Sequence, residues 1–503
     1  MAYVRTVKTS SGATAVQVVW SSRRGSREIE HLGSAHDEAG VAALRAAAAQ
    51  RLAAGQAQLD LGLVERSAAE PLPITSSKSA LLWEALCAAY AHIGLEEATD
   101  SDEAFRQLVL ARIIEPTSKA DSLRVIDETG VAPVSYPTLN RRLPVFAKPA
   151  FRQSLSAACA THARLGRASL VLYDVSTLHF ETDAGDGFRE PGFSKERRLD
   201  PQITLGLLTD ASGFPLTVAA FEGNKAETAT MVPVIDAFKA AHNLTDVTVV
   251  ADAGMISEAN QVALHAAGLT YILGARIPLL PDVVREWRDK HPDEAVPDGL
   301  VLTQPWPSTT SEKARGIPDR VTHYQYRHDR ARRTLRGIDE QVRKAERAVD
   351  GHAPVKRNRF IQLSGATKSV NRTLEAKTRA LAGWKGYTTN LVGQPASFVI
   401  DAYHQLWRIE KAFRMCKHDR QAHPIYHRTR DSIEAHLTVV FAAMAVSHWI
   451  ETQTGWSIKK FVRTARRYRT VTIQAGKHTL TAAQPPPPEL AEILGKTHDP
   501  HAH

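Results

Sequence analysis

Two aspartates stand within or directly after apolar segments of the chain. Asp174 lies in the apolar run 170–175, and Asp252 follows the run 247–251. An acid inside an apolar strand is costly to bury unless it is paired or binds a metal ion. Each aspartate alone has an equally good explanation as an ordinary strand-end or turn residue. Together they indicate a carboxylate site of the kind that hard divalent ions such as Mg²⁺ prefer.

A third acid, Glu410, lies in the segment 401–417, which we expect to be helical. Tyr403, Glu410 and Lys417 are seven residues apart, so they share one face of a continuous helix. Such a face could offer a metal ligand between two phosphate contacts. The alternative is a helix with a solvated polar edge that packs through its apolar residues. Those residues are Leu406, Trp407, Ile409 and Phe413.

Three carboxylates brought together by a fold would suit the transfer of phosphoryl groups. Two divalent ions about 4 Å apart can activate a nucleophile and stabilise the leaving oxygen of an in-line displacement at phosphorus. We therefore expect Asp174, Asp252 and Glu410 to be catalytic and to bind Mg²⁺ or Mn²⁺.

The elements that must position these acids follow the order β-β-β-α-β-α-β, the order of an RNase H-like α/β domain. In such a sheet the first and fourth strands are neighbours, which would place Asp174 beside Asp252. The expected strands cover 169–175, 203–208, 215–221, 247–251 and 270–274, and the expected helices cover 230–242 and 257–267. A further strand at 386–391 and helices at about 396–418 and 430–452 would complete the core. The core thus has two parts, 168–280 and 386–452.

Between the two parts of the core lies a basic insertion, residues 281–385. Residues 313–379 hold 18 Lys and Arg against 7 Asp and Glu, a local charge of +11 in a chain of formal charge +9. Apolar residues recur there at alternating spacings of three and four, which predicts a helix with one apolar stripe and a basic face. They are Leu335, Ile338, Val342, Ala345 and Val349. A concentrated positive charge favours a polyanionic partner.

The regions outside the core are predicted as follows. Residues 1–65 hold a β-hairpin, with its turn at 10–12, and an Ala-rich helix at 37–57; residues 66–77 form a linker. Residues 78–164 are helical. Three short helices, at 102–114, at 118–128 and from Ser135 onward, resemble a helix-turn-helix module for DNA, and an ordinary helical bundle is the alternative. The last helix would expose Thr138, Asn140, Arg141 and Arg142. Residues 453–503 are expected to be a C-terminal tail with a proline run at 485–488.

The composition argues against several other classes of protein. The three cysteines are far apart and form no zinc or disulfide pattern. The N-terminus has no signal-type apolar stretch. The stretch 437–450 is too short to span a bilayer and contains His448, so we interpret it as a buried helix. We expect a cytoplasmic protein that does not enter a membrane.

The three acids, in these contexts, resemble the DDE triad of bacterial insertion-sequence transposases, with the best match to the insertion-sequence-four group. That group has a Tyr-x2-Arg-x3-Glu-x6-Lys signature around its last acid. Tyr403, Glu410 and Lys417 match it, whereas Leu406 stands at the arginine position; Arg408 or Arg414 could substitute. The segments 192–202, 252–255 and 433–437 also resemble the group, and the resemblance extends over roughly residues 1–450.

The resemblance implies a DNA transposase that cleaves the ends of an insertion sequence and transfers the strands to target DNA. It also implies a homodimer on DNA. Residues expected to contact DNA are Tyr403, Arg408, Arg414, Lys417, Lys195 and Arg198. One alternative is another nuclease of the same fold, such as a resolvase. A second alternative is a DNA-binding derivative that has lost catalysis, although the intact acids argue against it.

Overall fold

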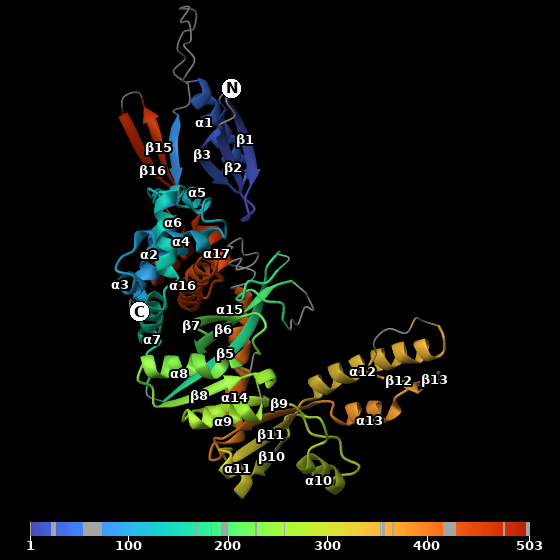
Figure 1. The fold of residues 1–503 in the computed structure, drawn as a ribbon. Coiled ribbons are helices and arrows are strands. Elements are labelled where there is room, and N and C mark those ends of the chain that lie inside the picture. The colour runs from blue at the N-terminus through green and yellow to red at the C-terminus, as the bar shows by residue number, and fades with distance from the viewer. Residues whose placement is uncertain are drawn as a thin grey trace, which may run out of the picture.

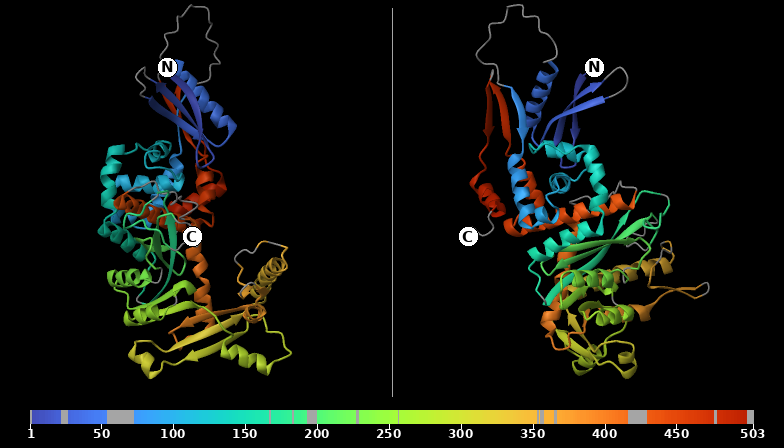
Figure 2. Two further views of the ribbon diagram at one scale, coloured as in Figure 1. Left: turned by 45° about the vertical axis from the view of Figure 1, so that its right-hand side comes forward. Right: turned by 60° about the vertical axis from the view of Figure 1, so that its left-hand side comes forward.

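The computed structural model shows an elongated molecule. It describes residues 2–21, 27–53, 73–166, 168–182, 184–192, 200–226, 229–255, 257–352, 354, 358–364, 367–415, 429–475 and 478–498. Small sheets lie at one end, helices occupy the middle, and a large sheet lies at the other end (Figure 1). An arm projects from the large sheet, and two further views show that it stands apart from the body (Figure 2).

The large sheet contains the five strands predicted for the core. They are β5 (Ala168–His179), β6 (Gln202–Asp210), β7 (Pro215–Glu222), β8 (Asp246–Ala251) and β9 (Thr270–Ala275). They are ordered β7-β6-β5-β8-β9. The first three strands pair antiparallel, whereas β8 runs parallel to both β5 and β9. Helices α8 (Met231–Ala241) and α9 (Glu258–Ala266) connect the later strands, so the predicted order of elements is confirmed.

Three more strands extend the sheet beyond β9. These are β14 (Trp384–Thr389), β11 (Arg320–Tyr326) and β10 (Val301–Trp306), and all pair antiparallel. Two of them, β10 and β11, come from the predicted insertion 281–385, together with α10 (Asp282–Lys290) and α11 (Thr310–Ala314). Part of the insertion therefore belongs to the same sheet as the acids.

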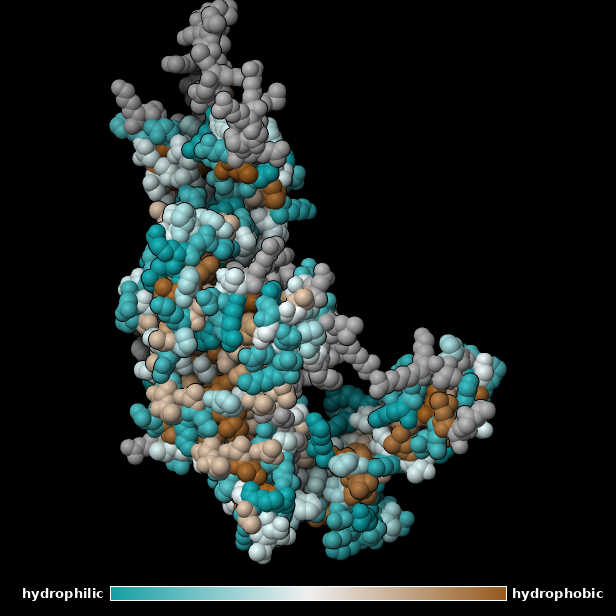
Figure 3. Space-filling model, viewed as in Figure 1, coloured by the Kyte–Doolittle hydropathy of each residue, from teal (hydrophilic) through white to brown (hydrophobic). Residues whose placement is uncertain are grey.

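The arm is the rest of that insertion. It consists of α12 (His328–Val349), β12 (Ile361–Ser364), β13 (Thr367–Val370) and α13 (Arg372–Ala380). The predicted apolar stripe of α12 is confirmed in its middle part, because Ile338, Val342 and Ala345 are buried against Phe360. The ion pair from Arg379 to Asp339, at 2.6 Å, joins α13 to α12. Apolar side chains also show on the surface of the arm and over the body around α8 (Figure 3).

The helices after β14 differ from the prediction of one helix at 396–418. Helix α14 (Ala396–His404) ends before Gln405, and α15 (Leu406–Arg414) begins after it. The Gln405 amide donates to the Ala402 carbonyl at 3.1 Å, and the Arg408 amide donates to the Gln405 carbonyl at 2.8 Å. These bonds span three residues instead of four, so they tighten the backbone at Gln405 and divide the helix.

Helix α16 (Arg430–Thr454) runs through the middle of the molecule. By length and composition it is the one helix among the described residues that could cross a membrane, but 89% of its most apolar window is buried inside the protein. The predicted buried helix at 437–450 is confirmed as part of this core helix.

Six helices form the middle of the molecule with α16: α2 (Ala80–His92), α3 (Leu95–Ala98), α4 (Glu103–Ile114), α5 (Ser122–Asp127), α6 (Tyr136–Phe146) and α7 (Pro149–His162). The helices predicted at 102–114 and from Ser135 onward are present as α4 and α6, and Asp102 and Ser135 cap them. Asn140 and Arg141 are exposed on α6, as expected. Arg142, in contrast, is half-buried and forms an ion pair with Asp102.

The N-terminal region forms one three-stranded sheet, and both ends of the chain contribute to a second one. The predicted hairpin is present as β1 (Ala2–Lys8) and β2 (Thr14–Ser21), and β3 (Arg27–Ala35) and α1 (Glu38–Ala53) follow it. Strand β4 (Ile74–Lys78) lies in the predicted linker and pairs with β15 (Thr470–Ala475). The segment after 453 is therefore not a tail: it also forms α17 (Ile458–Ala465), β16 (His478–Ala483) and α18 (Pro488–His498).

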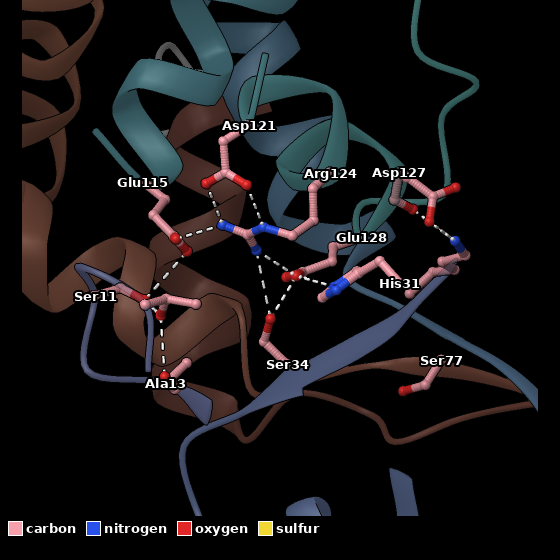
Figure 4. A network of polar contacts seen from close by, with 12 residues as sticks. Ser11, Ala13, His31, Ser34, Ser77, Glu115, Asp121, Arg124, Asp127 and Glu128 are labelled. Atoms are coloured by element: carbon pink, nitrogen blue, oxygen red, sulfur yellow. Dashed lines mark hydrogen bonds and ion pairs between the residues drawn. The ribbon is translucent and has the colours of Figure 1, made fainter. Parts of the chain in front are cut away.

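A buried ionic network connects these parts (Figure 4 shows its Arg124 side). Arg466, directly after α17, pairs with Glu115 at 2.9 Å and with Glu128 at 2.5 Å. Arg124 pairs with the same two acids at 2.6 and 2.7 Å. His31 on β3 lies 2.6 Å from Glu128. The network thus joins the N-terminal sheet, the helical middle and the C-terminal segment.

Candidate active site

The register of the large sheet aligns the two predicted aspartates. Leu172 on β5 lies opposite Val250 on β8. Two residues further along, Asp174 and Asp252 occupy corresponding positions on the same face of adjacent strands, where strands are about 5 Å apart. Asp174 is half-buried within β5, and Asp252 is exposed directly after β8. The register therefore places the two acids at corresponding positions of neighbouring strands.

The next strand carries a glycine in the same row. Ala251 lies opposite Leu273 on β9, so Gly274 is the neighbour of Asp252. A Cβ atom at Gly274 would lie 2.6 Å from the Tyr403 hydroxyl oxygen. Only a residue without a side chain lets Tyr403 of α14 come this close to the sheet. The Tyr403 hydroxyl uses the space to donate a hydrogen bond to Asp252 Oδ1, at 2.8 Å.

Tyr403 is held firmly in this position. Its side chain is buried, and its ring meets that of Tyr387 on β14 edge to face, with centroids 4.9 Å apart. Burial raises the pKa of Tyr403 far above its usual range, and the hydrogen bond to Asp252 and the charge of Glu410 raise it further. The phenol therefore stays protonated and acts as a hydrogen-bond donor that orients the Asp252 carboxylate.

Glu410 lies on the exposed side of α15. Its charge raises the pKa of both Tyr403 and Lys385, so Glu410 lies in the neighbourhood of these two side chains. Within the parts of the chain that the structure describes, it has no hydrogen-bond or ion-pair partner. No group of three or more His, Cys, Asp and Glu side chains in those parts is close enough to hold a metal ion. The register thus aligns the two aspartates, but within the described residues the structure does not close the three acids into one cluster.

The sequence analysis missed a lysine at this site. Lys385 is half-buried on β14, and its Nζ lies 4.3 Å from the centre of the Tyr403 ring. Burial lowers the pKa of Lys385 and so does the positive charge of Arg330, whereas Asp252 and Glu410 act in the opposite direction. A charged residue beside the apolar positions of a strand is the same signal that marked Asp174, and it could have identified Lys385.

The structure places the residues expected to contact DNA in different environments. Arg408 is half-buried and donates to the Ala211 carbonyl at 3.3 Å, in the turn between β6 and β7. It comes two residues before Glu410, slightly more than half a helical turn away, and its bond to Ala211 holds α15 to this turn. Arg414 is exposed one turn after Glu410. Lys195, Arg198 and Lys417 lie outside the described residues.

Comparisons with known proteins bear on the same segment. Residues 166–446, more than half of the chain, match the family model described as a transposase DDE domain. No curated protein matches this chain. Among solved structures, the chain is similar to a piggyBac transposase in a synaptic complex with hairpin DNA. The two are 10% identical, the match covers 80% of this chain and 73% of that chain, and the TM-score is 0.37.

Proposed function

The chain belongs to the family of transposases with a DDE domain and is a DDE transposase, and on this premise we propose that Asp174, Asp252 and Glu410 are its catalytic acids. The alignment of Asp174 with Asp252 on adjacent strands is the observation that carries the proposal. Glu410 supports it because its exposed carboxylate lies on the helix directly after Tyr403, which hydrogen-bonds to Asp252. All three acids lie within the segment that matches the family.

We assign the strand order β7-β6-β5-β8-β9 to an RNase H-like core. Three antiparallel strands followed by parallel strands that alternate with helices support this assignment. The arm and strands β10 and β11 are inserted between β9 and the helices that carry Tyr403 and Glu410. The core is therefore interrupted in the chain but continuous in space.

The donor atoms at this site suit a hard divalent ion, because carboxylate oxygens are the ligands that Mg²⁺ and Mn²⁺ prefer. Asp252 and Glu410 are both solvent-exposed, so an ion could reach them without breaking a buried ion pair. Asp174, Asp252 and Glu410 would hold it. When bound, such ions would lower the pKa of an attacking hydroxyl group and stabilise negative charge on the leaving oxygen.

The protein's own groups prepare the site for DNA. Tyr403 fixes the orientation of Asp252. We propose that water first cleaves the strand at the end of an insertion sequence, and that the freed 3′-hydroxyl then attacks a phosphate of the target DNA. Arg414 is a proposed phosphate contact, as are Lys417, Lys195 and Arg198. The helices α4 to α6, with help from the arm, would recognise the element's ends, and two copies of the chain would hold two ends.

The test is to remove one acid at a time. Asp174→Asn, Asp252→Asn and Glu410→Gln keep side-chain shape but lose a negative ligand, so each should abolish nicking and strand transfer with Mg²⁺ or Mn²⁺. Binding to the element's ends in gel shifts should remain. Asp401→Asn, an exposed acid on α14, is the matched control and should cut normally. Cutting at the normal rate by any of the three acid variants would refute its assignment, and cutting without strand transfer would favour a nuclease of the resolvase kind.

A further inference from the structure

We propose that Lys385 binds a phosphate of the DNA beside the three acids, which makes it a further catalytic residue of the site. This inference rests on the proposed function, because it assumes that DNA is cut beside Asp174, Asp252 and Glu410. These three acids are called the acidic row below. It gives the site a cation from β14, a strand that the signature around Glu410 does not include. The signature's arginine position cannot supply that cation, since Leu406 is an apolar residue buried in the core.

The first observation is the position of the ammonium group. Lys385 Nζ lies 4.3 Å from the centre of the Tyr403 ring, and the hydroxyl of the same ring bonds to Asp252. An ammonium group over an aromatic face is attracted to the ring, which restricts where it can move. Tyr403 therefore positions both the Asp252 carboxylate and the Lys385 ammonium group. The charges of Asp252 and Glu410 both raise the pKa of Lys385, so both acids lie in its neighbourhood.

The second observation is what Lys385 does not do. Lysines are almost never fully buried without a partner, and Lys385 is half-buried. Across the described ranges, Lys385 forms no ion pair within 4.0 Å, even though two carboxylates lie in its neighbourhood. At Asp252, the hydrogen bond to Oδ1 comes from Tyr403 instead. The half-buried Lys385 ammonium group has no acidic partner among the described residues, so it is suited to bind an anion of a ligand.

The third observation is a second cation behind the first. Arg330, near the start of α12, donates to the carbonyls of Gln325 and Gly383 at 3.0 and 3.2 Å. These bonds fix its guanidinium at the base of the arm, where its positive charge acts on Lys385. Arg330 thus raises the cost of leaving Lys385 without an anion. A phosphate is the chemically fitting partner, because it is singly charged in a DNA backbone and accepts from an ammonium point charge.

The experiment compares Lys385→Met, Lys385→Arg and the matched control Lys377→Met, an exposed lysine on α13. End DNA is used unmodified and with a single neutral methylphosphonate at each position around the cleavage point. Lys385→Met should cut at least about tenfold more slowly, because a preorganised charge stabiliser is lost. The slope of log affinity against log salt should fall by about 0.9, the value for one phosphate contact on duplex DNA. Lys385→Arg should restore the slope, and Lys377→Met should match the wild type in cleavage.

The decisive result is that the effects of Lys385→Met and of one neutral methylphosphonate on the cleavage rate do not add. Neutralising that phosphate should slow the wild type by the same factor as Lys385→Met, and should not slow Lys385→Met further. The proposal is overturned if every neutral phosphate slows Lys385→Met as much as it slows the wild type, or if Lys385→Met cuts normally. If Lys385→Met does not fold, Lys385→Arg becomes the test. A folded Lys385→Arg variant that lacks the wild-type salt slope and cleavage rate would also overturn the proposal.

Asp252→Asn, run in the same assay, separates the two proposals. If Asp252→Asn cannot cut while Lys385→Met cuts normally, the proposed function stands and the role of Lys385 fails. If Asp252→Asn cuts at the wild-type rate, the proposed function itself fails, whatever Lys385→Met does.

Discussion

The molecule contains two clusters of charged residues that are built in opposite ways. In the network around Arg466, the central charges are paired with one another and buried: the side chains of Arg466, Glu115 and Glu128 are 3%, 1% and 2% exposed. Among the three proposed catalytic acids, Asp252 after β8 and Glu410 on α15 are exposed to solvent. Burying charge is tolerated only when every partner is present. The first cluster is therefore complete within the chain, whereas the second is left open for ligands.

The two clusters also differ in what they connect. The network joins residues from β3, the helical middle and the segment after α17, which are hundreds of positions apart. The acidic row comes from one sheet and the two short helices that lie over it. We infer that the network determines how the parts of the protein are held, and that the acidic row determines the chemistry. Four predictions test this division.

The largest expected effect separates catalysis from stability at the acidic row. Glu410→Gln should reduce cleavage by at least about 1000-fold, since several kcal/mol of charge stabilisation are lost and each 1.4 kcal/mol is worth about tenfold. Its free energy of unfolding should stay within about 0.5 kcal/mol of the wild type, because the side chain is exposed. Cleavage assays and denaturant unfolding measure both. A stability loss of several kcal/mol would place Glu410 in the structural class instead.

The reverse pattern is expected in the network. Arg466→Met should lower the free energy of unfolding by about 3–5 kcal/mol, because it leaves Glu115 and Glu128 buried with fewer partners. Cleavage per folded molecule should not change. Arg463→Met, an exposed residue on α17, is the control and should be near neutral. Denaturant unfolding followed by circular dichroism gives the comparison, and equal stability of the two variants would contradict the proposed role of the network.

The network should also make the protein sensitive to acid. Burial alone would raise the pKa of Glu128, but His31, Arg466 and Arg124 together hold it well below its usual range. In acid the unfolded chain therefore binds a proton that the folded chain does not, so stability is lost as the pH falls below about 4.5 toward the folded pKa. Unfolding measured from pH 6 to pH 3 should show this loss. Glu128→Gln should be less stable at pH 6 but should show a shallower pH dependence; an unchanged slope would mean that other acids dominate.

The smallest expected effect lies at the hydrogen bond between Tyr403 and Asp252. Tyr403→Phe keeps the ring that Lys385 contacts but removes the donor that orients the carboxylate. Removal of such a supporting group costs about 10–100-fold in activity. The free energy of unfolding should fall by no more than about 1.5 kcal/mol, the usual worth of one hydrogen bond. Tyr387→Phe keeps the same aromatic contact and is the control; equal cleavage by both variants would show that the Tyr403 hydroxyl has no role.

Much of the candidate site could be predicted because its signals are local. Asp174 and Asp252 stand out against apolar strands, and the strands themselves follow from short runs of apolar residues. The stripe on α12 and the burial of α16 follow from periodicity and composition in the same way. The interruption at Gln405 could not be seen, because neighbouring helix-forming residues give no sign that two tight turns will divide the helix.

The sequence alone determined which residues form the core strands, and it led to the proposal that three acids bind a divalent ion, since both depend on side-chain chemistry over a few positions. Only the tertiary structure decided that β4 pairs with β15 and that β10 and β11 extend the sheet of the acids. It also brought Arg408 to the Ala211 carbonyl and Lys385 over the Tyr403 ring. Pairing between strands hundreds of residues apart depends on which edges and faces are left open after the local elements form, and no local pattern contains that information.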